Sequence, residues 1–169
     1  MNIAVLTVSG SYYFRPDTTL NREAEEYYVP DGVESLNLVP CIFSRIGKAG
    51  KCISSRFARR YINNFCFGVL LDAPELCAGE ATCMDATTCL SAAMPLEELG
   101  NAVFEVNLNG RPCFRYDDFN FGMLSDALVK ITRRSSVRAS DMIAVCLSDG
   151  IRLEKGDSCT FARRSLSIL

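Results

Sequence analysis

Short apolar runs separated by turn residues dominate the pattern of hydrophobic and polar positions along the chain. Runs of this length, rich in β-branched and aromatic side chains, are typical of strands buried within a sheet. Glycine, proline, asparagine and aspartate, which favour turns, stand between them. The pattern predicts strands over residues 3–9, 12–14, 27–29, 39–46, 65–71, 103–108, 113–116, 142–147 and 158–161.

A β-hairpin is the clearest local signal. Val103 to Leu108 alternates apolar and polar positions, and the Asn109-Gly110 dipeptide that follows is favoured in two-residue hairpin turns. Residues 113–116 are then expected to return as the partner strand.

Three segments have helical character. Ser54 or Ser55 can cap a helix in which aromatic residues recur at every fourth position. Residues 95–100 are typical of a single helical turn ended by glycine, and residues 121–134 carry one apolar stripe. Many short strands with few helices indicate a β-rich α+β protein, and we expect residues 1–169 to form one domain.

Composition places the chain among ordinary globular proteins. Hydrophobic residues make up 49% and charged residues 22%, with a formal net charge of −2, so we expect neither a nucleic-acid partner nor a membrane partner. The Arg163-Arg164 pair, like the other arginine pairs, is interpreted as a solvated face or helix end. No apolar run approaches the ~20 residues of a membrane span, and the N-terminus lacks a basic leader. We expect a cytoplasmic protein.

Cysteine is abundant and histidine is absent. The chain has 9 cysteines without a CxxC pair, and the even spacing of Cys77, Cys83 and Cys89 indicates a metal cluster only weakly. Because no secretory signal is recognised, we favour reduced and mostly buried thiols.

Five segments share their order and spacing with motifs of one enzyme family. They are FRPDT, RIGKAGKCISSRFARRYINNFCFGV, PLEELG, VNLNGRP, and SDMIAVCLSDG followed by LEKGD. With them the chain resembles the fumarylacetoacetate hydrolase superfamily in its small single-domain bacterial form, from Phe14 to about Phe161. The resemblance implies a mixed β-sheet roll of the fumarylacetoacetate hydrolase C-terminal-domain type.

The resemblance also implies a metal site, at which this chain has other residues. Such enzymes bind a magnesium-type cation, which prefers oxygen ligands, through an ExE pair and a later aspartate. Val39 and Cys41 align with the two glutamates and Leu70 with the aspartate, while Asp72 shares the face of Leu70 if the strand continues. We therefore expect no metal cofactor.

The positions for substrate and proton transfer are changed as well. Thr82 aligns with the family's lysine, and Val145, Cys146 and Leu147 align with the segment that binds substrate. The family's catalytic histidine has no counterpart, since the chain contains no histidine. A residual pocket could use the remaining acidic side chains and one thiol, namely Asp72, Glu75, Asp85 and Cys146.

Three functions stay open at this point. The one we favour is a non-catalytic family member with a structural, regulatory or partner-binding role. The second is a protein that binds a small keto acid or related anion through Arg45, Lys48 or Lys51. The third is a hydrolase, isomerase or decarboxylase with altered chemistry, in which Cys146 would need a nearby base or positive field. The resemblance further implies a homodimer, or pairing with an active relative.

Overall fold

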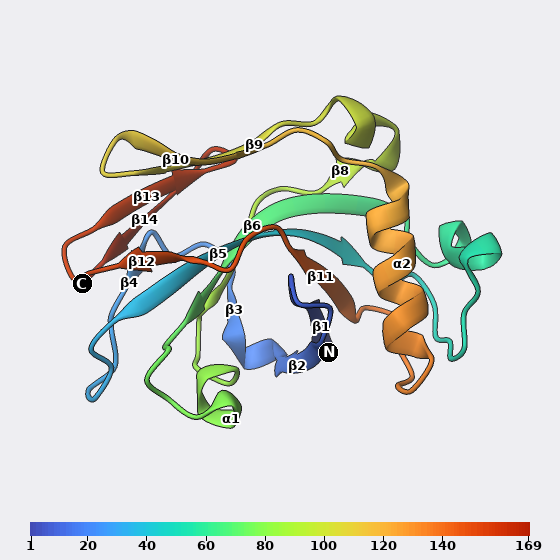
Figure 1. Cartoon of the computed structure of the whole chain (residues 1–169), viewed down its shortest axis with the longest axis horizontal. Helices are drawn as coiled ribbons and strands as arrows, with labels where there is room; N and C mark the ends of the chain where they lie inside the picture. The colour runs from blue at the N-terminus through green and yellow to red at the C-terminus, as the bar shows by residue number, and fades with distance from the viewer.

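The computed structural model describes all residues from Met1 to Leu169 and contains two β-sheets and one long helix (Figure 1). The larger sheet is mixed and strongly curled. Its 9 strands are β1 (Asn2–Leu6), β2 (Tyr12–Pro16), β3 (Leu20–Asn21), β5 (Leu36–Arg45), β6 (Asn64–Asp72), β7 (Thr88–Leu90), β8 (Met94–Pro95), β11 (Met142–Cys146) and β12 (Ile151–Leu153). They follow the order β2-β1-β11-β5-β6-β7-β3, with β12 beside β5 and β8 beside β6.

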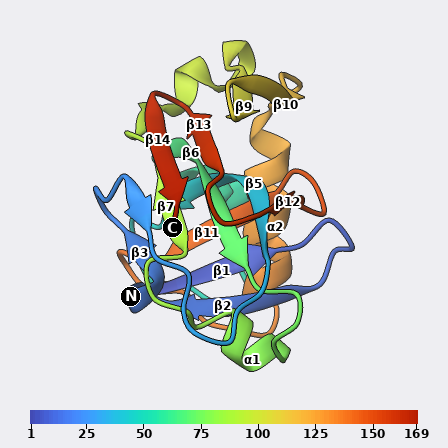
Figure 2. The same ribbon diagram turned by 90° about the vertical axis from the view of Figure 1, so that its left-hand side faces the viewer.

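The smaller sheet packs over β6. Its 5 strands are β4 (Glu26–Tyr27), β9 (Phe104–Leu108), β10 (Arg111–Tyr116), β13 (Ser158–Phe161) and β14 (Arg164–Ile168), in the order β10-β9-β13-β14-β4. Figure 2 shows β9, β10, β13 and β14 grouped above the larger sheet. Phe67 of β6 stacks on Phe104 of β9 with ring centroids 4.6 Å apart. This contact joins the two sheets through one core.

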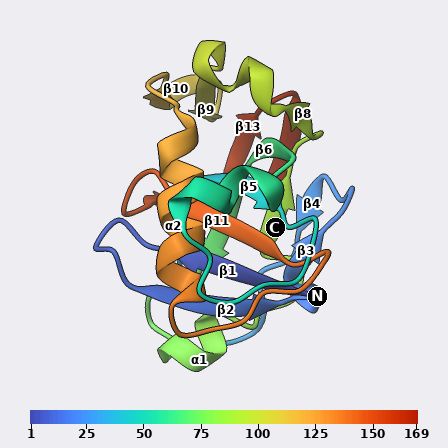
Figure 3. The same cartoon turned by 90° about the vertical axis from the view of Figure 1, so that its right-hand side faces the viewer.

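Helical segments are short except for one. They are α1 (Ala78–Ala81), α2 (Phe121–Thr132) and the 3-10 turns η1 (Asp17–Thr19), η2 (Ser55–Arg60) and η3 (Leu96–Asn101). Helix α2 lies along β11 and β1 (Figure 3). Its buried face includes Leu124, Leu128 and Ile131, each worth about 1.5–3 kcal/mol of transfer free energy. None of the helices is long and apolar enough to cross a membrane.

The two faces of the larger sheet bury different sets of side chains. One face packs against α2 and the smaller sheet and forms the main core. The other face curls on itself and encloses a second set of buried side chains, which we call the inner cluster. Its 9 members are Ile3, Val5, Val39, Cys41, Phe43, Cys66, Leu70, Met142 and Ala144.

The β-rich α+β fold class is confirmed, as are several local predictions. Asn109 and Gly110 have φ values of 52° and 75°, as the hairpin between β9 and β10 requires. Helix α2 and the turn η3 confirm the helical segments predicted over 121–134 and 95–100. These elements depend on neighbours in the chain, so their residues suffice to predict them.

The helix predicted after Ser54 is confirmed only in its first residues, and its extension to Phe65 is wrong. The chain makes only the 3-10 turn η2, and β6 begins at Asn64, so Phe65 belongs to a strand. Phe57 is 40% exposed whereas Phe65 is fully buried. Pairing of β6 with β5 therefore overrides the local spacing of aromatic residues.

Strand β14 is not predicted by the pattern, and Arg164 within it is not on a solvated face. The hairpin turn before it uses Ala162 and Arg163 at φ values of 43° and 67°, without the glycine that marks such turns. The guanidinium of half-buried Arg164 donates to the backbone carbonyls of Leu90 and Ala24 at 2.9 and 3.1 Å. It thus ties β14 to the larger sheet.

The expectation of mostly buried thiols is wrong for several cysteines. Of the 9 thiols, 4 are buried, 4 are exposed, and Cys146 is intermediate. Cys77 and Cys83 are exposed while Cys89 is buried. No group of three or more His, Cys, Asp or Glu side chains is arranged so that it could hold a metal ion.

Candidate functional site

The residues aligned with the family's metal ligands meet on one face of the larger sheet. Val39 and Leu70 are direct partners in the register of β5 and β6, and Cys41 lies opposite Gly68. Cys41 and Leu70 are fully buried and Val39 is 6% exposed. All three belong to the inner cluster, so their side chains pack against apolar neighbours.

This set of side chains does not fit a magnesium-type cation. Val39 and Leu70 carry no ligand atom, and the Cys41 sulfur is a soft donor, whereas magnesium prefers hard oxygen. Burial raises the pKa of the Cys41 thiol well above its ordinary value, with a further contribution from Cys146. The thiol is therefore protonated at neutral pH and is a poor ligand for a hard cation such as magnesium.

Asp72 is the carboxylate nearest to these positions along the chain, and a buried arginine holds it. Strand β6 continues through Asp72, which places its side chain on the face of Leu70 as the sequence predicts. The Asp72 Oδ1 accepts a hydrogen bond from Arg15 Nη1 at 2.9 Å. Burial raises the pKa of the Asp72 carboxyl, and the Arg15 guanidinium opposes that shift.

Arg15 is a site residue that sequence reasoning missed. It lies in β2, is fully buried, and its Nη2 donates to the Leu71 carbonyl at 3.2 Å and to the Thr87 hydroxyl. Only its Nε lacks a partner. Beside it, burial and the charge of Asp72 raise the pKa of Tyr13, which keeps the phenol neutral. A single arginine within a short apolar strand was the signal available.

The residues that the resemblance aligns with the substrate-binding segment, Val145, Cys146 and Leu147, lie on different faces of the larger sheet. Cys146 faces the inner cluster, where its Sγ lies 3.6 Å from that of Cys41. Val145 and Leu147 pack against the main core instead. Arg15 donates its hydrogen bonds to Asp72, Leu71 and Thr87. This buried cation therefore forms no hydrogen bond with Cys146.

The remaining predicted residues do not join this group. Asp85 is exposed, and the Thr82 hydroxyl donates to the Gly79 carbonyl at 3.2 Å. The Glu75 carboxylate accepts the backbone N–H groups of Glu34 and Ser35 at 2.6 and 3.1 Å. Glu75 therefore holds the loop before β5.

Glu75→Gln is expected to loosen that loop, because the amide accepts these hydrogen bonds more weakly than a carboxylate. The Ser35 backbone N–H lowers the pKa of Glu75. The stabilisation from this hydrogen bond is thus fully present above the ordinary pKa of a glutamate and is lost as pH falls through the lowered pKa of Glu75. Amide hydrogen exchange at Ser35 should accelerate in the variant. Glu80→Gln, an exposed control, should leave this rate unchanged, and equal rates in both variants would contradict the role of Glu75.

The cations proposed for anion binding lie on the surface. Arg45, Lys48 and Lys51 are all exposed. Arg45 donates to the Ser140 hydroxyl at 3.1 Å, and the Lys48 ammonium lies 4.6 Å from the centroid of the Tyr61 ring. None of the three belongs to the inner cluster, although Arg45 lies opposite its member Met142 in the register of β11 and β5.

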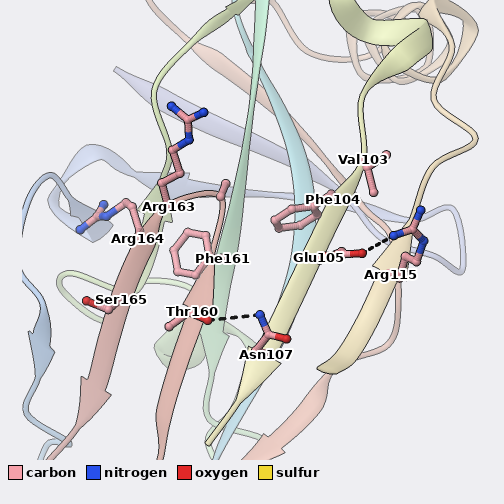
Figure 4. Close-up of a pocket in the computed structure, with 11 residues that line it drawn as sticks. Val103, Phe104, Glu105, Asn107, Arg115, Thr160, Phe161, Arg163, Arg164 and Ser165 are labelled. Carbon is pink, nitrogen blue, oxygen red and sulfur yellow. Dashed lines mark hydrogen bonds and ion pairs between the residues drawn. The ribbon is translucent and has the colours of Figure 1, made fainter. Parts of the chain in front are cut away.

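A wide hollow of about 700 Å³ lies on the smaller sheet, away from all predicted site residues (Figure 4). Four of its polar side chains are paired with one another: Arg115 with Glu105, and the Asn107 amide with the Thr160 hydroxyl at 3.3 Å. Arg164 donates to backbone carbonyls outside the hollow, and Arg163 makes no side-chain hydrogen bond or ion pair. A ligand that binds Arg115, Glu105, Asn107 or Thr160 would have to compete with these contacts.

Comparisons with known proteins bear on the fold. No family model matches the chain, and no curated protein is similar to it in sequence. Solved structures do match. A protein from Yersinia pestis CO92 assigned to the fumarylacetoacetate hydrolase family has a TM-score of 0.82 at 17% identity, covering 99% of this chain and 92% of that chain.

Two further structures carry names of enzymes. Fumarylpyruvate hydrolase from Pseudomonas aeruginosa, in complex with Mn²⁺ and pyruvate, has a TM-score of 0.83 at 12% identity and covers 100% of this chain and 89% of that chain. The 5-carboxymethyl-2-hydroxymuconate delta-isomerase from Mycobacterium smegmatis has a TM-score of 0.81 at 14% identity and covers 99% of this chain and 78% of that chain. The chain therefore has the fold of fumarylacetoacetate hydrolase family proteins, which confirms the predicted sheet roll.

Proposed function

We propose that this chain is a non-catalytic protein with the fumarylacetoacetate hydrolase fold, serving a structural, regulatory or partner-binding role. One observation carries the proposal: the positions aligned with the metal ligands, Val39, Cys41 and Leu70, are buried in the inner cluster. A metal pocket of this family would need charged oxygen donors there. Apolar side chains at the same place contribute to the stability of the fold.

The ion pair at the end of β6 supports the same proposal. Asp72 keeps a carboxylate near the aligned positions, but the fully buried Arg15 binds it at 2.9 Å. A cation at Asp72 would have to displace this guanidinium and leave a buried positive charge without its partner. The pair thus acts as a structural link between β2 and β6.

An enzyme assay tests the proposal. The purified chain, given an acylpyruvate such as fumarylpyruvate, or oxaloacetate, with Mg²⁺ or Mn²⁺, is expected to show no turnover above buffer. The Pseudomonas aeruginosa fumarylpyruvate hydrolase serves as the positive control. Titration calorimetry with Mn²⁺ should give no binding heat. Turnover that a chelator abolishes would overturn the proposal.

The hypothesis of a keto-acid-binding protein stays a prediction that a thermal-shift screen with dicarboxylates can test. Stabilisation by such a ligand in the absence of turnover would favour it. Altered chemistry at Cys146, the homodimer and the cytoplasmic location likewise stay predictions.

A further inference from the structure

Two thiols face each other at the edge of the inner cluster. Cys41 of β5 and Cys146 of β11 are direct partners across antiparallel strands, and their Sγ atoms are 3.6 Å apart. At the next position the Leu147 amide donates to the Pro40 carbonyl at 2.9 Å. Hydrogen-bonded and non-hydrogen-bonded pairs alternate along such strands. The cysteines therefore occupy a non-hydrogen-bonded pair, in which the Cα atoms are about 4.5 Å apart.

This placement is compatible with a disulfide. Bridged cysteines usually have Cα atoms about 4.4–6.8 Å apart and sulfurs about 2.05 Å apart. The strands already provide the first distance. The sulfurs need to approach by only about 1.5 Å, which side-chain rotation can supply without separating β5 from β11.

The two thiols differ in their access to solvent. Cys41 is fully buried, whereas Cys146 is partly exposed at the end of β11. A small oxidant can therefore reach Cys146 first, with Cys41 already in place behind it as the second thiol. A solvent-accessible thiol beside a second thiol is a common feature of reversible redox sites.

We propose that Cys41 and Cys146 form a reversible disulfide when the protein meets hydrogen peroxide. The Cys146 sulfur attacks one peroxide oxygen, the O–O bond breaks, and water leaves, which produces a sulfenic acid at Cys146. The Cys41 sulfur then attacks the Cys146 sulfur, the S–O bond breaks, and the hydroxyl leaves as water with the Cys41 proton. The two thiols together give two electrons to peroxide, and a small thiol reverses the step by exchange.

The disulfide would change the protein at the place where the family carries its chemistry. It would fasten β11 to β5 and cross-link two positions that are 105 residues apart. Such long-range cross-links restrict the unfolded chain strongly. The oxidised protein should therefore unfold about 10 °C above the reduced protein. This inference stands whether or not the chain is catalytic.

Peptide mapping of the whole chain tests the proposal. Dilute protein is treated with hydrogen peroxide, its free thiols are blocked, and its peptides are separated without reduction. We expect a Cys41–Cys146 cross-linked peptide, the loss of 2 of the 9 thiols from this pair, and a rise in Tm that dithiothreitol reverses. Cys146→Ser should abolish the cross-link. Cys113→Ser, at an exposed thiol on β10, should keep it.

Two results would overturn the proposal. One is oxidation of Cys146 to sulfinic acid in the native chain without any cross-link to Cys41. The other is a set of disulfides that joins only other cysteines. Both results are observed in the wild-type protein, so they test the proposed disulfide even if a variant fails to fold. Cys41→Ala provides a second variant in which the cross-link must be lost.

Discussion

Replacing Arg15 with methionine is expected to lower the free energy of unfolding by about 3–5 kcal/mol, the range for removing one partner of a buried ion pair. Arg15 is fully buried and is the hydrogen-bond donor to Asp72, Leu71 and Thr87. Methionine fills much of the same volume but leaves these acceptors without a donor. The decrease in the free energy of unfolding should lie near the lower end of this range, because the Asp72 side chain is 28% exposed and water screens part of its charge.

Urea denaturation followed by circular dichroism measures this change. Arg115→Met is the matched control, because Arg115 also binds two acidic side chains, Glu105 and Asp117, but all three are exposed. Exposed pairs contribute little, so the control should unfold at nearly the wild-type urea concentration. If Arg15→Met were no less stable than the control, the Arg15–Asp72 link between β2 and β6 would be refuted.

Leu70→Asp is expected to prevent folding, although it restores the residue type that the resemblance aligns at this position. Leu70 is fully buried in the inner cluster. Removing a buried leucine side chain costs about 2–5 kcal/mol, and an unpaired carboxylate there adds several kcal/mol more. The sum approaches the whole stability of an ordinary domain, about 5–15 kcal/mol.

Circular dichroism with and without Mn²⁺ decides this prediction. Leu70→Met, which conserves volume and polarity, should cost less than about 1.5 kcal/mol and remain folded. An aspartate variant that folds and gains stability from Mn²⁺ would show that the region is still a metal pocket. That result would contradict the proposed function.

Much of the fold could be predicted because its signals are local. The Asn109-Gly110 turn, the apolar stripe of α2 and the apolar run of β6 each show in consecutive residues. Strand β14 escaped prediction because Ala162 and Arg163 adopt positive φ without the glycine that usually reveals such a turn.

The candidate site could be predicted only in part from the sequence. The aligned positions Val39, Cys41 and Leu70 could be named from the resemblance, and their apolar or soft character is visible in the printed sequence. The partner of Asp72 could not be named. Arg15 lies 57 residues earlier in the chain and reaches Asp72 only because the larger sheet curls.

Local turn chemistry and periodicity can thus be recognised in consecutive residues, and they account for the hairpin, α2 and strands such as β5 and β6. The sequence also shows that histidine is absent, and the resemblance predicts which side chains stand where the family has carboxylates. That Val39, Cys41 and Leu70 fill a buried cluster, and that Cys41 faces Cys146, follows from the pairing of β5 with β6 and β11. Strand register joins residues far apart in the chain, and folding of the whole sheet decides which of them meet.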